Sequence, residues 1–161
     1  MTTREYNQCV DMHADGLYRF ILKNIKDEEK ARDVVQDTFE KLWIKVADVP
    51  FEKCKSYLFT AGYHTMIDKI RREKKIGSME EAKPMTLATQ QKNFELKKIL
   101  DDALATLPEA QRSVILLRDY EGYSYDEIGQ IMQLTESQVK VYIFRGRQTL
   151  KKILGSVEAV L

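Results

Sequence analysis

The sequence predicts an all-α protein of two small helical domains joined by a flexible linker, the second domain containing a helix-turn-helix. Apolar residues recur at three- and four-residue spacing along almost every segment, as on the buried face of a helix. Only seven glycines and three prolines interrupt 161 residues. A glycine-serine pair and one proline fall within residues 76–92, which lack a sustained apolar period. This stretch is therefore the predicted linker.

The first domain, residues 1–75, is predicted to hold three helices. The first covers residues 3–24. Asp27 is a suitable N-cap for the second, because Glu28 and Glu29 follow it in the turn where the helix dipole favours anions. The second helix runs to about residue 46, and its predicted buried stripe is Ala31, Val35, Thr38, Leu42 and Val46. Pro50 ends this segment, and the third helix covers residues 55–75.

The second domain, residues 93–161, contains three capping-box patterns, in which a hydroxyl and a side chain three residues later satisfy each other's backbone amides. These patterns are Thr106-x-x-Glu109, Ser124-x-x-Glu127 and Thr135-x-x-Gln138. Between the last two lie a short helix, residues 125–132, and a two-residue turn. This arrangement is typical of a helix-turn-helix, with the small Gly129 where the two helices must approach.

The helix that follows this turn has two contrasting faces. Its apolar face carries Val139, Ile143, Gly146 and Leu150. The opposite face mixes polar, apolar and cationic groups, which suit base edges, thymine methyls and phosphates respectively. The candidate contacts to duplex DNA are Ser137, Gln138, Lys140, Val141, Phe144, Arg145, Arg147 and Gln148. Taken alone, the segment is also compatible with an ordinary helical hairpin that has a solvated basic face.

The net charge of +1 conceals two basic segments. Residues 51–76 carry seven basic and three acidic side chains, and residues 136–161 carry five and two. Two such segments in a nearly neutral protein indicate two anionic contacts. In the first segment aromatic rings, which can stack on unpaired bases, alternate with cations, which follow phosphates. The candidates there are Lys55, Tyr57, Tyr63, His64, Lys69, Arg71 and Arg72. A core role for some of these rings remains equally open.

The second helix presents an acidic face opposite its buried stripe. This face carries Asp33, Asp37, Glu40 and Ile44, with Gln36 and Trp43 at its flanks. Carboxylates would repel DNA, whereas acids around an exposed isoleucine and an indole suit a protein partner. The alternatives are a solvated acidic face and a Trp43 that belongs to the core.

In this order, the three segments resemble a bacterial sigma factor of the extracytoplasmic-function (ECF) type. The matching residues are 33–43 and 57–72 in the first half, and 107–112, 123–128 and 139–147 in the second. The resemblance implies that Asp33, Gln36, Asp37, Glu40 and Trp43 bind the clamp helices of core RNA polymerase. It also implies that the basic aromatic segment melts and captures the minus-ten promoter element and that the last helix reads the minus-thirty-five element.

The resemblance thus implies a cytoplasmic factor that directs promoter recognition and transcription initiation. Members of the family are often held inactive by an anti-sigma factor, which adds such a protein to the implied partners. Departures from the family pattern limit what is carried over. Tyr57 stands where tryptophan is usual and His64 where asparagine is usual. Val141, Tyr142, Phe144 and Gly146 replace the common serine, arginine, histidine and alanine. The promoter sequence is therefore not implied.

Other functions find less support in the sequence. It has no GxxxxGK or HExxH motif, so neither an enzyme nor a cofactor is expected. Cys9 and His13 form half of a metal site at i,i+4 spacing, but no second pair completes it, and no metal is expected. No apolar run approaches the ~20 residues of a membrane span, and the charged N-terminus is unlike a signal peptide.

Two alternatives to the sigma factor remain. One is a two-domain helix-turn-helix regulator that binds an operator without core polymerase. The other is a helical adaptor that binds only proteins. The regulator would need neither the acidic helix nor the basic aromatic segment, and the adaptor would show no salt-dependent DNA affinity.

Overall fold

The structure is a computed structural model that describes residues 1–75 and 92–160, and these residues contain helices and no strand. The predicted linker, residues 76–92, lies outside the described residues except for its last position. The elements, in chain order, are α1 (Thr3–Ile25), α2 (Glu28–Ile44), a 3₁₀ turn η1 (Phe51–Lys53), α3 (Cys54–Lys75), α4 (Lys92–Thr106), α5 (Glu109–Ile115), a π-helical turn η2 (Leu116–Tyr120), α6 (Tyr125–Met132) and α7 (Glu136–Val160). The all-α prediction is confirmed.

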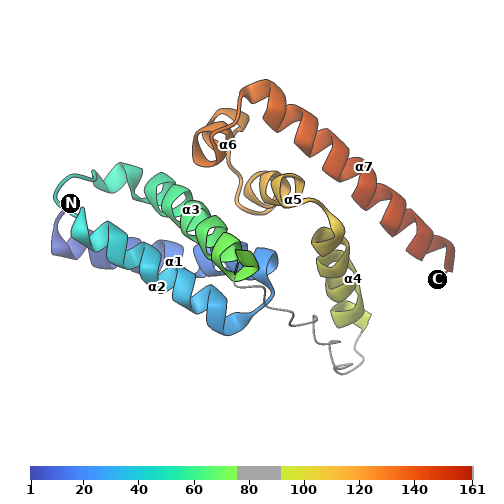
Figure 1. The fold of residues 1–161 in the computed structure, drawn as a ribbon, viewed down its shortest axis with the longest axis horizontal. Helices are drawn as coiled ribbons and strands as arrows, with labels where there is room; N and C mark the ends of the chain where they lie inside the picture. Colours follow the sequence, from blue (N-terminus) through green and yellow to red (C-terminus); the bar gives the residue numbers. More distant parts are fainter. Residues whose placement is uncertain (76–91, 161) are drawn as a thin grey trace.

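Helices α1, α2 and α3 pack side by side into one bundle (Figure 1). Their ends lie close to the predicted positions. Asp27 caps α2 by accepting a hydrogen bond from the Lys30 amide at 3.1 Å. α2 ends at Ile44, two residues before the predicted end, because the chain turns there towards η1.

The buried stripe of α2 is partly different from the prediction. Ala31, Thr38 and Leu42 are buried as expected, whereas Val35 and Val46 are only half-buried. The buried face instead includes Val34 and Phe39, since α2 packs against both α1 and α3 and so turns a wider face inward.

The first of the three predicted capping boxes is wrong. Thr106 is the last residue of α4, and its hydroxyl donates to the carbonyl of Ala103 at 2.7 Å instead of capping α5. A threonine still inside a helix satisfies its hydroxyl on the preceding turn. The N-cap of α5 is Pro108, which has no side-chain cap, and Glu109 accepts a hydrogen bond from the Ser113 hydroxyl.

The helix-turn-helix formed by α6 and α7 is confirmed. Ser124 and Glu127 form a reciprocal capping box at the start of α6. Thr135 and Gln138 do the same at the start of α7, at 2.9 and 3.1 Å. A side-chain carbon at Gly129 would lie 2.7 Å from the carbonyl oxygen of the following turn. Glycine is therefore what allows the turn to close tightly.

The second bundle, α4 to α7, docks against α1 and α3 of the first (Figure 1). The rings of Phe59 and Tyr123 meet edge to face with centroids 5.3 Å apart. Arg19 makes two hydrogen bonds of 3.1 Å to Glu121, whose side chain is almost fully buried. Lys23 pairs with Asp101 at 2.8 Å. Hydrophobic packing and ion pairs thus join the two bundles.

Candidate nucleic-acid interface

The outer face of α7 is the most open of the candidate surfaces. Val139, Ile143, Gly146 and Leu150 are buried, as predicted. All eight predicted DNA contacts on the opposite face are exposed: Ser137, Gln138, Lys140, Val141, Phe144, Arg145, Arg147 and Gln148. Phe144 is 63% exposed although it is a large apolar side chain. An uncovered phenylalanine among cations is suited to a thymine methyl in the major groove.

Arg147 differs from its neighbours on this face because it already has a partner. Its guanidinium donates two hydrogen bonds to the carboxylate of Asp119, at 2.6 and 3.3 Å. The hydrogen bond to Asp119 raises the pKa of Arg147 above its ordinary value. A DNA phosphate would compete with this carboxylate for the guanidinium. Arg147 can therefore bind DNA only when its ion pair with Asp119 breaks.

Helix α3 carries the seven basic or aromatic candidates of the first domain on different faces. Tyr57, His64 and Arg71 are spaced by seven residues, or two helical turns, and share one stripe. Tyr57 and His64 are half-exposed and Arg71 is exposed, as is Arg72 beside it. Lys69 lies outside this stripe, on the side of α3 that faces α2, where it pairs with Asp33 at 3.5 Å. This stripe forms the open face of α3.

The second face of α3 is a stripe at four-residue spacing, formed by Lys55, Phe59 and Tyr63, and we call it the covered face. The ammonium of Lys55 lies over the ring of Tyr123, 4.7 Å from its centroid. Tyr63 is only 9% exposed. Burial, and then the nearby Glu109 of α5, raises the pKa of its hydroxyl. The docked second bundle therefore lies over two of the seven candidates.

The acidic face of α2 is free of such contacts with the second bundle. Asp33, Gln36, Asp37, Glu40 and Trp43 are all exposed, as is Ile44. Trp43 is 48% exposed, and its indole packs on one side against the ring of Tyr6, with ring centroids 5.0 Å apart. Trp43 is thus a surface residue held in place by a neighbour, which suits a protein-binding anchor.

The sequence reasoning missed the polar contacts that fix the docking of the two bundles. Arg112 of α5 donates to the side-chain oxygen of Asn24 on α1 at 2.7 Å, and burial lowers the pKa of its guanidinium. These residues are 88 positions apart. No local pattern marks such a pair. The four-residue spacing of Lys55, Phe59 and Tyr63 was visible in the sequence. The sequence did not show that the second bundle covers this face of α3.

The geometry defines a helix-turn-helix protein of two helical bundles, and the comparisons with known proteins give its family. Residues 9–76 match the family model of sigma-70 region 2, and residues 97–150 match that of sigma-70, region 4. The chain is 30% identical to the ECF RNA polymerase sigma factor SigM of Bacillus subtilis, over 91% of this chain and 93% of that protein.

Two solved structures share the fold. One is the sigma factor RpoE in complex with the anti-sigma factor NepR from Bartonella quintana, with a TM-score of 0.81 and 23% identity over 95% of this chain and 98% of that one. The other is CnrH in complex with the cytosolic domain of CnrY, with a TM-score of 0.73 and 25% identity over 96% and 90%.

This chain belongs to the ECF family of RNA polymerase sigma factors. It is an initiation factor whose partners are core RNA polymerase and promoter DNA. Among residues 1–75 and 92–160, no helix is long and apolar enough to cross a membrane.

Proposed function

We propose that this sigma factor divides its work among three surfaces: the acidic face of α2 binds core polymerase, the open face of α3 captures the minus-ten element, and α7 reads the minus-thirty-five element. Residues 1–75 and 93–161 are the two functional domains, and residues 76–92 link them. The factor acts in the cytoplasm, where polymerase and promoter are found, and it catalyses no reaction itself. The separation of exposed acidic and basic faces on different helices carries this proposal.

The role of α7 is supported by the complete exposure of its mixed face. Lys140 and Arg145 contact phosphates or guanine edges, and Phe144 contacts a thymine methyl. Ser137, Gln138, Val141, Arg147 and Gln148 complete the contact surface. Because α7 begins beside a closed turn held by Gly129, its first turns are fixed in direction relative to α6. A rigid reading helix is what sequence discrimination in the major groove requires.

The role of α3 is to hold bases that have left the duplex. Tyr57 and His64 offer rings for stacking, and Arg71 and Arg72 neutralise the strand beside them. Unpairing costs a few kcal/mol per base, which these contacts must offset. Lys69 lies on the side of α3 that faces α2, and Lys55 and Tyr63 become accessible to DNA only after the second bundle moves away.

The acidic face of α2 is proposed to bind a basic surface of core polymerase. Asp33, Gln36, Asp37 and Glu40 supply polar complementarity, and Trp43 supplies the apolar anchor. Binding to the polymerase also brings the two DNA-reading domains to fixed positions. Two weak DNA contacts held on one scaffold bind together far more tightly than either does alone. An anti-sigma factor that covers one of these surfaces would keep the chain inactive.

A run-off transcription assay with sigma-free core polymerase tests this proposal. The template is a pool of genomic fragments from the native host. We expect transcripts with discrete start sites only when the chain is added. No initiation from any fragment would contradict the proposal. Tight operator binding by a dimer without polymerase would favour an ordinary helix-turn-helix regulator instead.

A further inference from the structure

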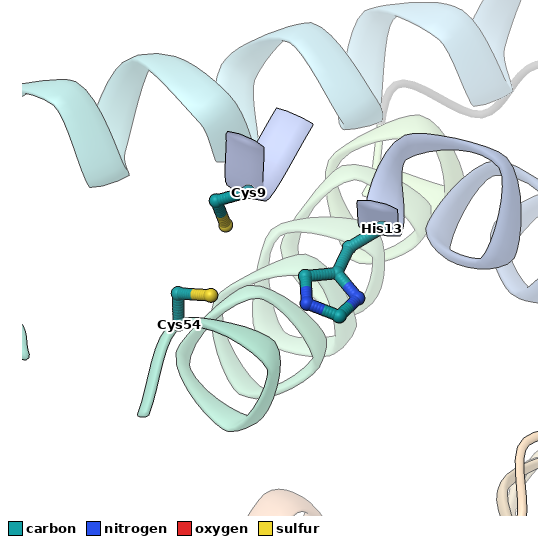
Figure 2. Close-up of side chains that lie close together, drawn as sticks. All are labelled: Cys9, His13 and Cys54. Atoms are coloured by element: carbon teal, nitrogen blue, oxygen red, sulfur yellow. The ribbon is translucent and has the colours of Figure 1, made fainter. Parts of the chain in front are cut away.

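The first bundle contains a cluster of soft metal-ligating groups that the three surfaces do not use. Cys9 and His13 lie one helical turn apart on α1, and Cys54 is the first residue of α3. Their ligating atoms all lie within 4.8 Å of one another. Figure 2 shows the two thiols and the imidazole converging on one space between the two helices. The sequence pattern showed two members of this group, Cys9 and His13, and the fold supplies the third.

We propose that Cys9, His13 and Cys54 form a binding site for a thiophilic divalent cation of the Zn²⁺ type. Two sulfurs and one imidazole nitrogen are a donor set that Zn²⁺ prefers, and three protein ligands leave a fourth position for water. Two thiolates would neutralise the charge of the cation, which suits a site where Cys9 is 0% and Cys54 2% exposed.

The geometry requires only a small contraction to hold the ion. Zinc–sulfur bonds of about 2.3 Å and zinc–nitrogen bonds of about 2.0 Å in a tetrahedron place the ligating atoms roughly 3.5–3.8 Å apart. The observed separations of at most 4.8 Å therefore need to shorten by no more than about 1.3 Å. Changes in side-chain torsions are enough for this. Half-buried His13 lies on the outer side of the cluster and gives the ion a path from solvent.

The third group is what favours a cation over a simple thiol pair. A disulfide between Cys9 and Cys54 would use both sulfurs, and the adjacent imidazole of His13 would take no part in the bond. A metal ion would use all three groups as ligands. Lys55, whose positive charge acts on His13, lies over the ring of Tyr123 and so has a partner outside the cluster. An ion bound here would cross-link α1 to the start of α3, next to the covered face.

Co²⁺ binding to the reduced, metal-stripped full chain under anaerobic conditions tests the site. We expect one equivalent to bind with a thiolate-to-cobalt charge-transfer band, whose intensity reports how many thiolates coordinate the ion. Zn²⁺ should displace Co²⁺ and raise the Tm of the chain, because it binds the folded state. No charge-transfer band for the wild-type chain would overturn the proposal, whatever the variants do.

Matched variants assign the ligands. C9S and C54S should each lose at least half of the band's intensity, because each removes one of the two thiolates. H13Q should weaken binding by about 100-fold or more, since loss of even an outer-shell partner costs about 10–100-fold. H64Q changes the other histidine of the chain and should bind Co²⁺ with the same affinity and band intensity as the wild type. An unchanged band in C54S would overturn the assignment. So would a chain that peroxide converts to a Cys9–Cys54 disulfide but that binds neither Co²⁺ nor Zn²⁺. These readouts do not depend on transcription.

Discussion

The two DNA-reading helices differ in how much of their candidate surface is free. On α7 all eight predicted contacts are exposed, whereas on α3 the second bundle covers Lys55 and Tyr63. The open face of α3, with Tyr57, His64 and Arg71, is unaffected. In this arrangement the candidate surface proposed for duplex DNA is therefore exposed completely, and the one proposed for the opened strand only in part.

The difference suggests an order of events. Duplex DNA is available before the promoter opens, so a free α7 face suits the first contact. The unpaired bases that α3 is proposed to hold exist only after the promoter has opened. Of the ion pairs that join the bundles, the pair between Lys23 and Asp101 is partly exposed, and a pair of this kind contributes only ~0.2–1 kcal/mol. In the other pair, between Arg19 and Glu121, the carboxylate is almost fully buried.

The largest expected effect comes from removing the polymerase contact. Asp37→Arg places a cation at the centre of the acidic face of α2 and should abolish core binding while leaving the fold intact, because Asp37 is exposed. A pull-down with core polymerase and a circular dichroism spectrum measure both. Asp15→Arg makes the same change on the exposed side of α1 and should bind normally. Unchanged pull-down of the Asp37 variant would refute the assignment of this face.

A second variant tests whether α7 depends on the tight turn before it. Gly129→Ala should destabilise the chain by about 1–3 kcal/mol, because the new methyl group meets a backbone carbonyl that cannot move independently. Gly155→Ala is the matched control: nothing lies within 4 Å of its added carbon, and it should stabilise α7 by about 0.5–1 kcal/mol. Chemical denaturation measures both. Equal stability of the two variants would show that the turn tolerates a side chain.

A third variant tests the exposed face of α7 directly. Arg145→Ala should weaken promoter binding by the holoenzyme by about 1–3 kcal/mol, at least about fivefold. A footprint titration at fixed salt measures this. Arg4→Ala removes another exposed arginine, on α1, and should leave the footprint as it is. If the Arg145 variant gave the wild-type footprint, Arg145 would no longer be a DNA contact.

The smallest effect is expected from loosening the docking of the bundles. Glu121→Arg replaces two hydrogen bonds to Arg19 with repulsion, at a cost of at least about 1 kcal/mol, because the Glu121 side chain is almost fully buried. The free chain should then bind a single-stranded minus-ten oligonucleotide about fivefold more tightly, since the covered face of α3 opens. Glu28→Arg adds the same charge on exposed α2, beside Arg32 and away from the docking contact. An equal gain in both variants would point to net charge rather than uncovering.

The sequence was enough to predict the local structure of this chain but not its long-range contacts. Helical periodicity and capping gave α1, α2, α3, α6 and α7, because these signals act within a few residues. The capping box at Thr106 was wrong because a threonine has an alternative partner inside its own helix. The contact between Phe59 and Tyr123 joins distant positions, and no spacing rule predicts which faces meet.

The same limit applies to the candidate sites. The exposed face of α7 could be predicted because a helix that buries one side exposes the other. The covering of Tyr63 could not be predicted, since it depends on how two domains dock. Two members of the metal-ligating cluster, Cys9 and His13, could be predicted because i,i+4 spacing is local. Cys54 could not, because it comes from another helix.

The central claim is that this chain reads a promoter tightly only on core polymerase. It is tested by measuring the affinity of the chain for one duplex promoter, at a single salt concentration, with and without saturating core polymerase. We predict binding at least about 100-fold tighter with the polymerase, because tethering adds the two domain contacts together. Equally tight and sequence-selective binding by the chain alone would contradict the account.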